Sequence, residues 1–122
     1  MENDKTIEGF YAKTRSHWRK WLQKNGQVEK SVPLIIHNKN SKTPSINYVE
    51  AVEEALCFGW IDSKALKRDE ESRFQFFTPR KAKSNWSKSN IERAERMIKE
   101  GLMTPQGQQH IDIAKEAGKW NL

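Results

Sequence analysis

Two segments of the chain combine aromatic, charged and hydroxyl-bearing residues in a way that suits ligand binding. The first segment, residues 59–63, follows an apolar run and contains Trp60, Asp62 and Ser63. The second segment, residues 77–88, holds four cations and one tryptophan within a dozen residues. Cations beside an aromatic ring suit phosphate groups and stacked bases. We therefore expect the chain to bind a ligand through these segments.

The two segments are expected to lie side by side and to form a groove for an anionic or aromatic ligand. Arg80 would hold the anionic group by a bidentate contact. Trp60 or Trp86 would stack on a flat or apolar part of the ligand, and Asp62 would orient Arg80 or a donor group of the ligand. The alternative is a solvated loop that Trp86 anchors to the core. The expected ligand-binding residues are Trp60, Asp62, Ser63, Thr78, Arg80, Lys81, Asn85 and Trp86.

The basic residues also suggest a second function, the non-specific binding of nucleic acid through the loop of residues 80–88. The net charge is +6, and a basic balance favours anionic partners. Lys64, Lys67 and Arg68 would extend the basic surface. Because 16 acidic residues accompany the 22 basic ones, the acidic side chains would have to lie away from such an interface. A small anionic ligand or a protein partner is therefore favoured over nucleic acid.

Catalysis rests on one candidate residue, Asp62. A half-buried carboxylic acid with a shifted pKa could serve as a general acid or base. The alternative is that Asp62 organises a turn by accepting backbone hydrogen bonds. The sequence has no Gly-x-Ser-x-Gly turn and no glycine-rich phosphate loop. An undiscovered enzyme that uses Asp62 is thus a third hypothesis, and no catalytic residue is predicted.

No metal site or cofactor is expected. His17, His37 and His110 lie in three different predicted elements, whereas zinc sites usually show close pairs of ligands. Cys57 is the single cysteine, so no Cys-x-x-Cys pair exists. It lies in an apolar run and is expected to be buried as a small hydrophobic residue.

Length and composition indicate one domain. A chain of 122 residues buries roughly two-thirds of the surface that it exposes when unfolded. The first residues are polar and lack an apolar signal segment, and no stretch approaches the ~18 apolar residues of a membrane span. A single cysteine without a disulfide partner fits a cytoplasmic location. We expect residues 1–122 to form one domain, with residues 1–9 flexible.

The pattern of apolar residues predicts an α+β fold with the order α-β-α-β-β-α-α. Periodicity, caps and breakers indicate each element. The predicted helices are 16–25, 47–58, 104–117 and one that Ser87 or Ser89 caps and that ends at Gly101. The predicted strands are 32–37, 60–67 and 72–78. We expect a small, mainly antiparallel three-stranded sheet packed against about four helices.

Residues 49–63 have the sequence Val-Glu-Ala-Val-Glu-Glu-Ala-Leu-Cys-Phe-Gly-Trp-Ile-Asp-Ser. This segment resembles a signature of the YdeI/OmpD-associated family, whose members are also called bacteriocin-protection proteins. A second match consists of Phe-Thr-Pro-Arg at residues 77–80 and Ser-Asn-Trp-Ser at residues 84–87, followed by Asn90. Residues 101–107 resemble the next helix–helix junction of that family. The resemblance runs from about Trp18 to Trp120.

The resemblance implies a role in protection against bacteriocins or peptide stress, and an association with an outer-membrane porin. It supplies no catalytic residues. Many relatives carry a further helical segment after the position of Trp120, whereas this chain ends at Leu122. The resemblance therefore indicates a stress-linked, non-enzymatic protein of the cytoplasm.

Overall fold

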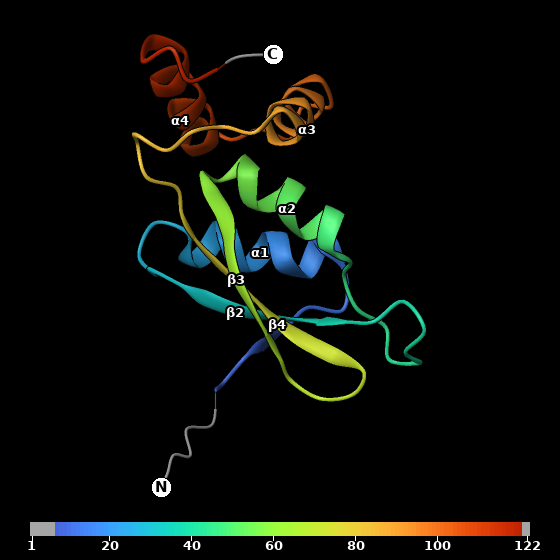
Figure 1. The fold of residues 1–122 in the computed structure, drawn as a ribbon. Helices are drawn as coiled ribbons and strands as arrows, with labels where there is room; N and C mark the ends of the chain where they lie inside the picture. Colours follow the sequence, from blue (N-terminus) through green and yellow to red (C-terminus); the bar gives the residue numbers. More distant parts are fainter. Residues whose placement is uncertain (1–6, 121–122) are drawn as a thin grey trace, which may run out of the picture.

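The structure, a computed structural model, describes residues 7–120 of the 122-residue chain. The expected flexibility of residues 1–9 thus falls mostly outside the described residues. Within them, strands and helices follow one another along the chain (Figure 1). The elements are β1 (Phe10–Tyr11), α1 (Arg15–Asn25), β2 (Val32–His37), α2 (Tyr48–Cys57), β3 (Trp60–Lys67), β4 (Ser72–Pro79), α3 (Lys88–Lys99) and α4 (Pro105–Glu116).

The sheet differs from the predicted one, because it has four strands and is mixed. Its order is β1-β2-β4-β3. β1 runs parallel to β2, with Phe10 opposite Leu34 and Tyr11 opposite Ile35, while the other two strand pairs are antiparallel. A strand of two residues is too short to show the alternation by which strands are identified in a sequence. The prediction of three mainly antiparallel strands is therefore wrong, although the molecule is α+β with four helices in its described part.

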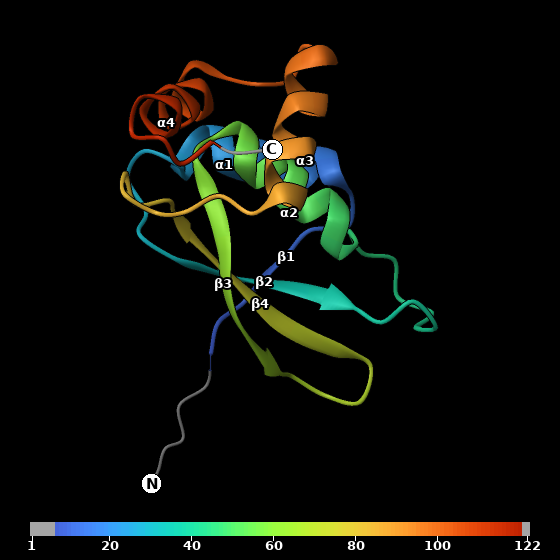
Figure 2. The same ribbon diagram turned by 45° about the horizontal axis from the view of Figure 1, so that its top comes forward.

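Alternating side chains give the sheet a buried face. Leu34 on β2 and Phe77 on β4 are fully buried, and they belong to the main hydrophobic core together with Trp18 and Leu22 of α1. Ile35 and Phe74 point to the other face, where they stand opposite each other in the ladder. Figures 1 and 2 show α1 and α2 on one side of the sheet. The core therefore lies between these two helices and the strands.

Local signals define both ends of α2. The side chain of Asn47 accepts a hydrogen bond from the backbone of Glu50, and the side chain of Glu50 accepts one from the backbone of Asn47. This capping box satisfies two backbone donors at the start of the helix. After the helix, Gly59 has a φ of 79°, a conformation that other residues adopt only at a cost. The chain can therefore turn at once from α2 into β3.

α2 is the central element of the molecule. α1, α3, α4 and β3 all contact it, and seven of its ten residues are buried. α4 approaches very closely at Gly107, where an added Cβ would lie 2.4 Å from the backbone oxygen of Cys57. Because helices cover α2 on several sides, its charged residues as well as its apolar ones become interior.

Candidate functional site

The structure brings the two predicted segments together. Trp60 stands opposite Pro79, and Asp62 opposite Phe77, in the antiparallel pair of β3 and β4. Beyond the end of this ladder, the backbone N–H of Arg80 donates to the backbone oxygen of Gly59 at 2.7 Å. The hairpin therefore positions the start of the basic loop beside the turn that follows α2.

Both tryptophans of the predicted groove belong to the interior. Trp60 is 1% exposed, and its indole nitrogen donates to the backbone oxygen of Gly26 at 2.9 Å. Trp86 is 9% exposed, and its ring centre lies 5.0 Å from that of Trp120. Neither ring offers a free face for a ligand in this arrangement. Trp86 acts instead as the anchor that holds the basic loop to the core.

Arg80 is buried beside Trp86, with an exposed fraction of 6%. Its guanidinium carbon lies 3.8 Å from the centre of the Trp86 ring, which is a cation–π contact. Nη1 donates to the hydroxyl of Ser84 at 2.8 Å and to the backbone oxygen of Asn85 at 3.2 Å. Burial lowers the pKa of Arg80 to about 10, and the negative charge of Asp62 partly offsets this effect by raising the pKa.

One edge of the Arg80 guanidinium has no acceptor. Nε is buried without a hydrogen-bond partner, and none of the described residues accepts from Nη2 or forms an ion pair with this side chain. Nε and Nη2 form the pair of parallel donors that arginine uses for bidentate binding of carboxylate or phosphate. The structure therefore holds a buried cation whose bidentate edge is free.

His110 of α4 supplies a second unpartnered nitrogen nearby. Its ring lies against Gly59, so that an added Cβ there would lie 2.6 Å from Cδ2. Nδ1 of His110 is buried without a partner. Burial lowers the pKa of His110, and the neighbouring charge of Arg80 lowers it further. His110, Gly59 and Pro79 also line a cavity of about 320 Å³, which thus reaches the residue before Arg80.

Asp62 is engaged by a phenol rather than by Arg80. The hydroxyl of Tyr48 donates to Oδ2 of Asp62 at 2.6 Å. Burial raises the pKa of Tyr48 to about 12, and the hydrogen bond to Asp62 contributes to this shift. The pair fastens the first turn of α2 to β3, which gives Asp62 a structural role.

The remaining predicted residues lie around this region without meeting in one groove. Ser63 is exposed, and its hydroxyl donates to the backbone oxygen of Phe76 at 3.3 Å. Thr78 is half-buried, whereas Lys81 and Asn85 are exposed. The hairpin cations are partly neutralised, because Lys67 pairs with Glu70 and Arg68 pairs with Asp69.

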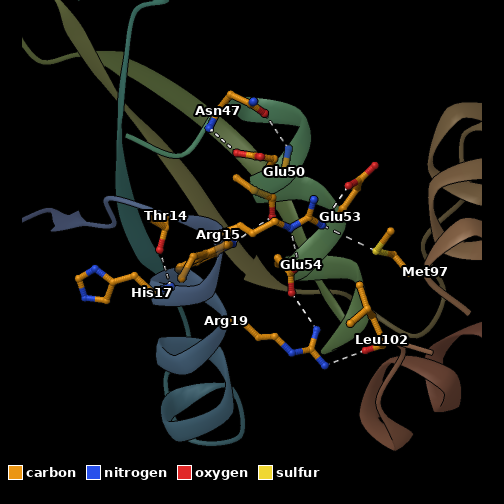
Figure 3. Close-up of polar contacts among 12 residues, drawn as sticks. Thr14, Arg15, His17, Arg19, Asn47, Glu50, Glu53, Glu54, Met97 and Leu102 are labelled. Carbon is orange, nitrogen blue, oxygen red and sulfur yellow. Dashed lines mark hydrogen bonds and ion pairs between the residues drawn. The ribbon is translucent and has the colours of Figure 1, made fainter. Parts of the chain in front are cut away.

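The structure contains a buried ionic cluster around Glu53 and Glu54 of α2 that the sequence pattern did not predict. Both carboxylates are less than 6% exposed. Figure 3 shows Arg15 and Arg19 reaching from α1 to these carboxylates on α2. Arg15 binds Glu53 at 3.0 Å and Glu54 at 2.7 Å, Arg19 binds Glu54 at 2.8 Å, and Arg96 of α3 also binds Glu53. The cluster joins three helices.

The sequence does contain a signal for this cluster. Two arginines four residues apart share one face of α1, and two glutamates stand next to each other in an apolar helix. Their pairing was not predictable because it depends on the way α1 and α3 pack on α2. Every carboxylate oxygen in the cluster has a charged partner, so the cluster is occupied by its own charges.

In the described part of the chain, no group of three or more His, Cys, Asp or Glu residues is arranged to hold a metal ion. No helix of residues 7–120 has the length and apolarity needed to cross a membrane.

Comparison with known families adds one decisive observation. A family described as a domain of unknown function (DUF8412) matches residues 10–110. The chain belongs to the DUF8412 family. The matched region of this DUF8412 domain contains all eight predicted ligand-binding residues and extends to His110. No match was found among curated proteins or among solved structures.

Proposed function

We propose that this DUF8412 domain is a non-enzymatic binding module that takes a small anionic ligand, with Arg80 as its anchor. The observation that carries the proposal is the free Nε–Nη2 edge of a guanidinium that is only 6% exposed. Buried charges are normally paired, because removing an ion from water is costly. A carboxylate or phosphate oxygen at this edge would supply the missing counter-charge.

In this proposal the ligand enters through the cavity beside Gly59, whose lining includes Pro79, the residue before Arg80. His110 lines that cavity and carries a buried, unpartnered nitrogen. In the tautomer with a proton on Nδ1, His110 would add a second donor for the same anionic group. Trp60 and Trp86 then shape the interior wall of the site rather than stack on the ligand.

The wider role follows from the resemblance to YdeI/OmpD-associated proteins in residues 49–63 and 77–87. On that ground we extend the proposal to an adaptor of bacteriocin or peptide-stress protection in the cytoplasm. The anionic group would belong to a free small molecule or to a protein partner. Acid–base catalysis by Asp62 gains no support from the geometry, because Tyr48 occupies its carboxylate.

Non-specific binding of nucleic acid remains the second candidate function. Lys81, Lys83 and Lys88 are all exposed, which favours contacts with phosphates. The burial of Trp86 removes base stacking from this candidate, so any affinity would come from charge and would fall steeply with salt. A gel-shift series in rising salt distinguishes it from binding at Arg80.

The test of the main proposal is ligand-dependent stability. Denaturant unfolding is measured with sodium phosphate and with sodium acetate, each against sodium chloride at equal ionic strength. A ligand that binds the folded state adds about 2.7 kcal/mol at a hundred times its Kd. The increment should persist in Arg73→Met, and adding Arg80→Met to that variant should abolish it. An increment of equal size in the double variant would exclude Arg80 as the anchor.

A further inference from the structure

A second cavity, of about 690 Å³, lies at the end of α2 opposite to the Gly59 turn. It is bounded by the end of β2, the loop of residues 38–47, the first turn of α2 and Arg73 of β4. This volume is within the roughly 300–1,000 Å³ that is typical of small-molecule sites. In Figure 1 the loop projects beyond the helices beside the hairpin of β3 and β4. The cavity is therefore separate from the Arg80 region.

The cavity wall is basic. Among the residues that line it, Arg73 and Lys39 carry positive charge and none is Asp or Glu. Arg73 is half-buried, and no described residue accepts a hydrogen bond from it or pairs with it. Its guanidinium lies over the ring of Tyr48, whose centre is 5.8 Å from the guanidinium carbon. Both cations are thus available to an anionic group.

The acidic residues close to the cavity are already engaged. Asp62 accepts from Tyr48, Glu50 accepts from the backbone of Asn47, and Glu71 accepts from the hydroxyl of Ser41. None of these carboxylates forms an ion pair with Arg73 or Lys39. Arg73 and Lys39 therefore form no ion pair with a described carboxylate, while Asp62, Glu50 and Glu71 keep their negative charge.

The same cavity offers an apolar and aromatic surface. Tyr48 is half-buried, and its hydrogen bond to Asp62 fixes its ring. Val49 beside it is 45% exposed, one of the few large apolar residues on the surface of the described chain, and Ile36 also lines the cavity. A fixed ring with apolar neighbours suits the flat body of a small organic molecule.

We propose that this cavity is a second ligand site, which takes a phosphate monoester with an aromatic body. The phosphate group lies against Arg73 and Lys39, and the body packs on Tyr48 and Val49. The juxtaposition of two unpaired cations with a fixed aromatic ring, in a cavity without acidic lining, carries the inference. It does not depend on the function proposed for Arg80.

The test uses adenosine 5′-monophosphate as the probe. Adenosine and inorganic phosphate, which each represent one half of the nucleotide, are measured separately for comparison. Calorimetry and ¹H–¹⁵N spectra of the whole chain are recorded with each compound. The nucleotide should bind saturably, shift the resonances of residues 36–49, and bind more tightly than either half. Arg73→Met should weaken binding by roughly tenfold or more, as expected for the loss of a charge-assisted contact. Lys39→Met should weaken it less.

Two controls separate this site from other effects. Lys20→Met, which removes an exposed cation of α1, should bind the nucleotide as the wild type does, so that a loss in Arg73→Met is not a general effect of lowered net charge. Val49→Ser leaves the charges in place. It should weaken the binding of the nucleotide without changing the affinity for inorganic phosphate. Unchanged nucleotide affinity in both Arg73→Met and Lys39→Met, or no saturable binding by the wild type, would overturn the proposal.

Discussion

The guanidinium of Arg80 lies 3.8 Å from the centre of the Trp86 ring. This contact explains how a cation from the basic loop can lie inside the molecule, because a ring face and two oxygen acceptors partly replace the water that it loses. Trp86 and Arg80 therefore form one unit, in which the ring supports the charge.

Replacement of Trp86 tests this unit. Trp86→Ala removes the ring that supports Arg80 and contacts Trp120. Because the side chain is 9% exposed, we expect the free energy of unfolding to fall by about 3–5 kcal/mol. Urea unfolding measures the loss. Lys83→Ala in the same loop is the control and should change stability by no more than about 0.5 kcal/mol; equal effects of the two changes would place Trp86 on the surface.

The ionic cluster between the helices predicts a second loss of stability. Glu54→Gln removes the charge that pairs with Arg15 and Arg19. Breaking a fully buried pair costs about 3–5 kcal/mol, and we expect about 2–3 kcal/mol here because both arginines are partly exposed. Glu95→Gln, an exposed position on α3, is the matched control. A Glu54→Gln protein as stable as the control would show that the cluster contributes nothing.

His110 predicts a dependence of stability on pH. Burial and Arg80 hold its pKa below the ordinary 6.5 in the folded state, so the unfolded chain binds a proton more readily. Stability that is fully present above about pH 6.5 is therefore lost as the pH falls toward the folded-state pKa. His110→Gln should reduce this slope, as measured by urea unfolding between pH 5 and pH 8. The same slope in the variant and the wild type would rule out this role of His110.

Cys57 is expected to be unreactive in the folded protein. It is fully buried, and burial followed by the charge of Glu54 raises its pKa to about 11. Since the thiolate is the reactive form, an aromatic disulfide reagent at pH 8 should modify Cys57 slowly in buffer and rapidly in guanidinium chloride. Rapid stoichiometric modification of the native protein would contradict the packing of α2 against α4.

Strong local signals made most elements predictable. Asn47 and Glu50 indicate the start of α2, and Gly59 indicates its end. Both signals can be identified in the sequence because caps and left-handed turns depend on neighbouring residues alone. β1 was not predictable, since Phe10 and Tyr11 form a strand only by pairing with β2. Its existence depends on the fold as a whole.

The candidate site was predictable in its position and not in its burial. The adjacency of Gly59 and Arg80 follows from the hairpin of β3 and β4, which the alternation of residues indicates. Sequence pattern does not say which of five tryptophans are interior, because a Trp on a loop can cover the core as well as face water. The role of His110 depends on α4 folding back onto the Gly59 turn, a contact between residues far apart in the chain.

The Nε–Hε resonance of Arg80 tests the central claim most directly. This resonance is assigned in ¹H–¹⁵N spectra by its loss in Arg80→Lys and is then followed during titration with sodium phosphate at constant ionic strength. Formation of a hydrogen bond from Nε to the anion predicts a saturable downfield shift of Hε, which persists in Arg73→Met. A resonance that does not move at any phosphate concentration, in a protein that remains folded, would contradict the assignment of Arg80 as an anion-binding residue.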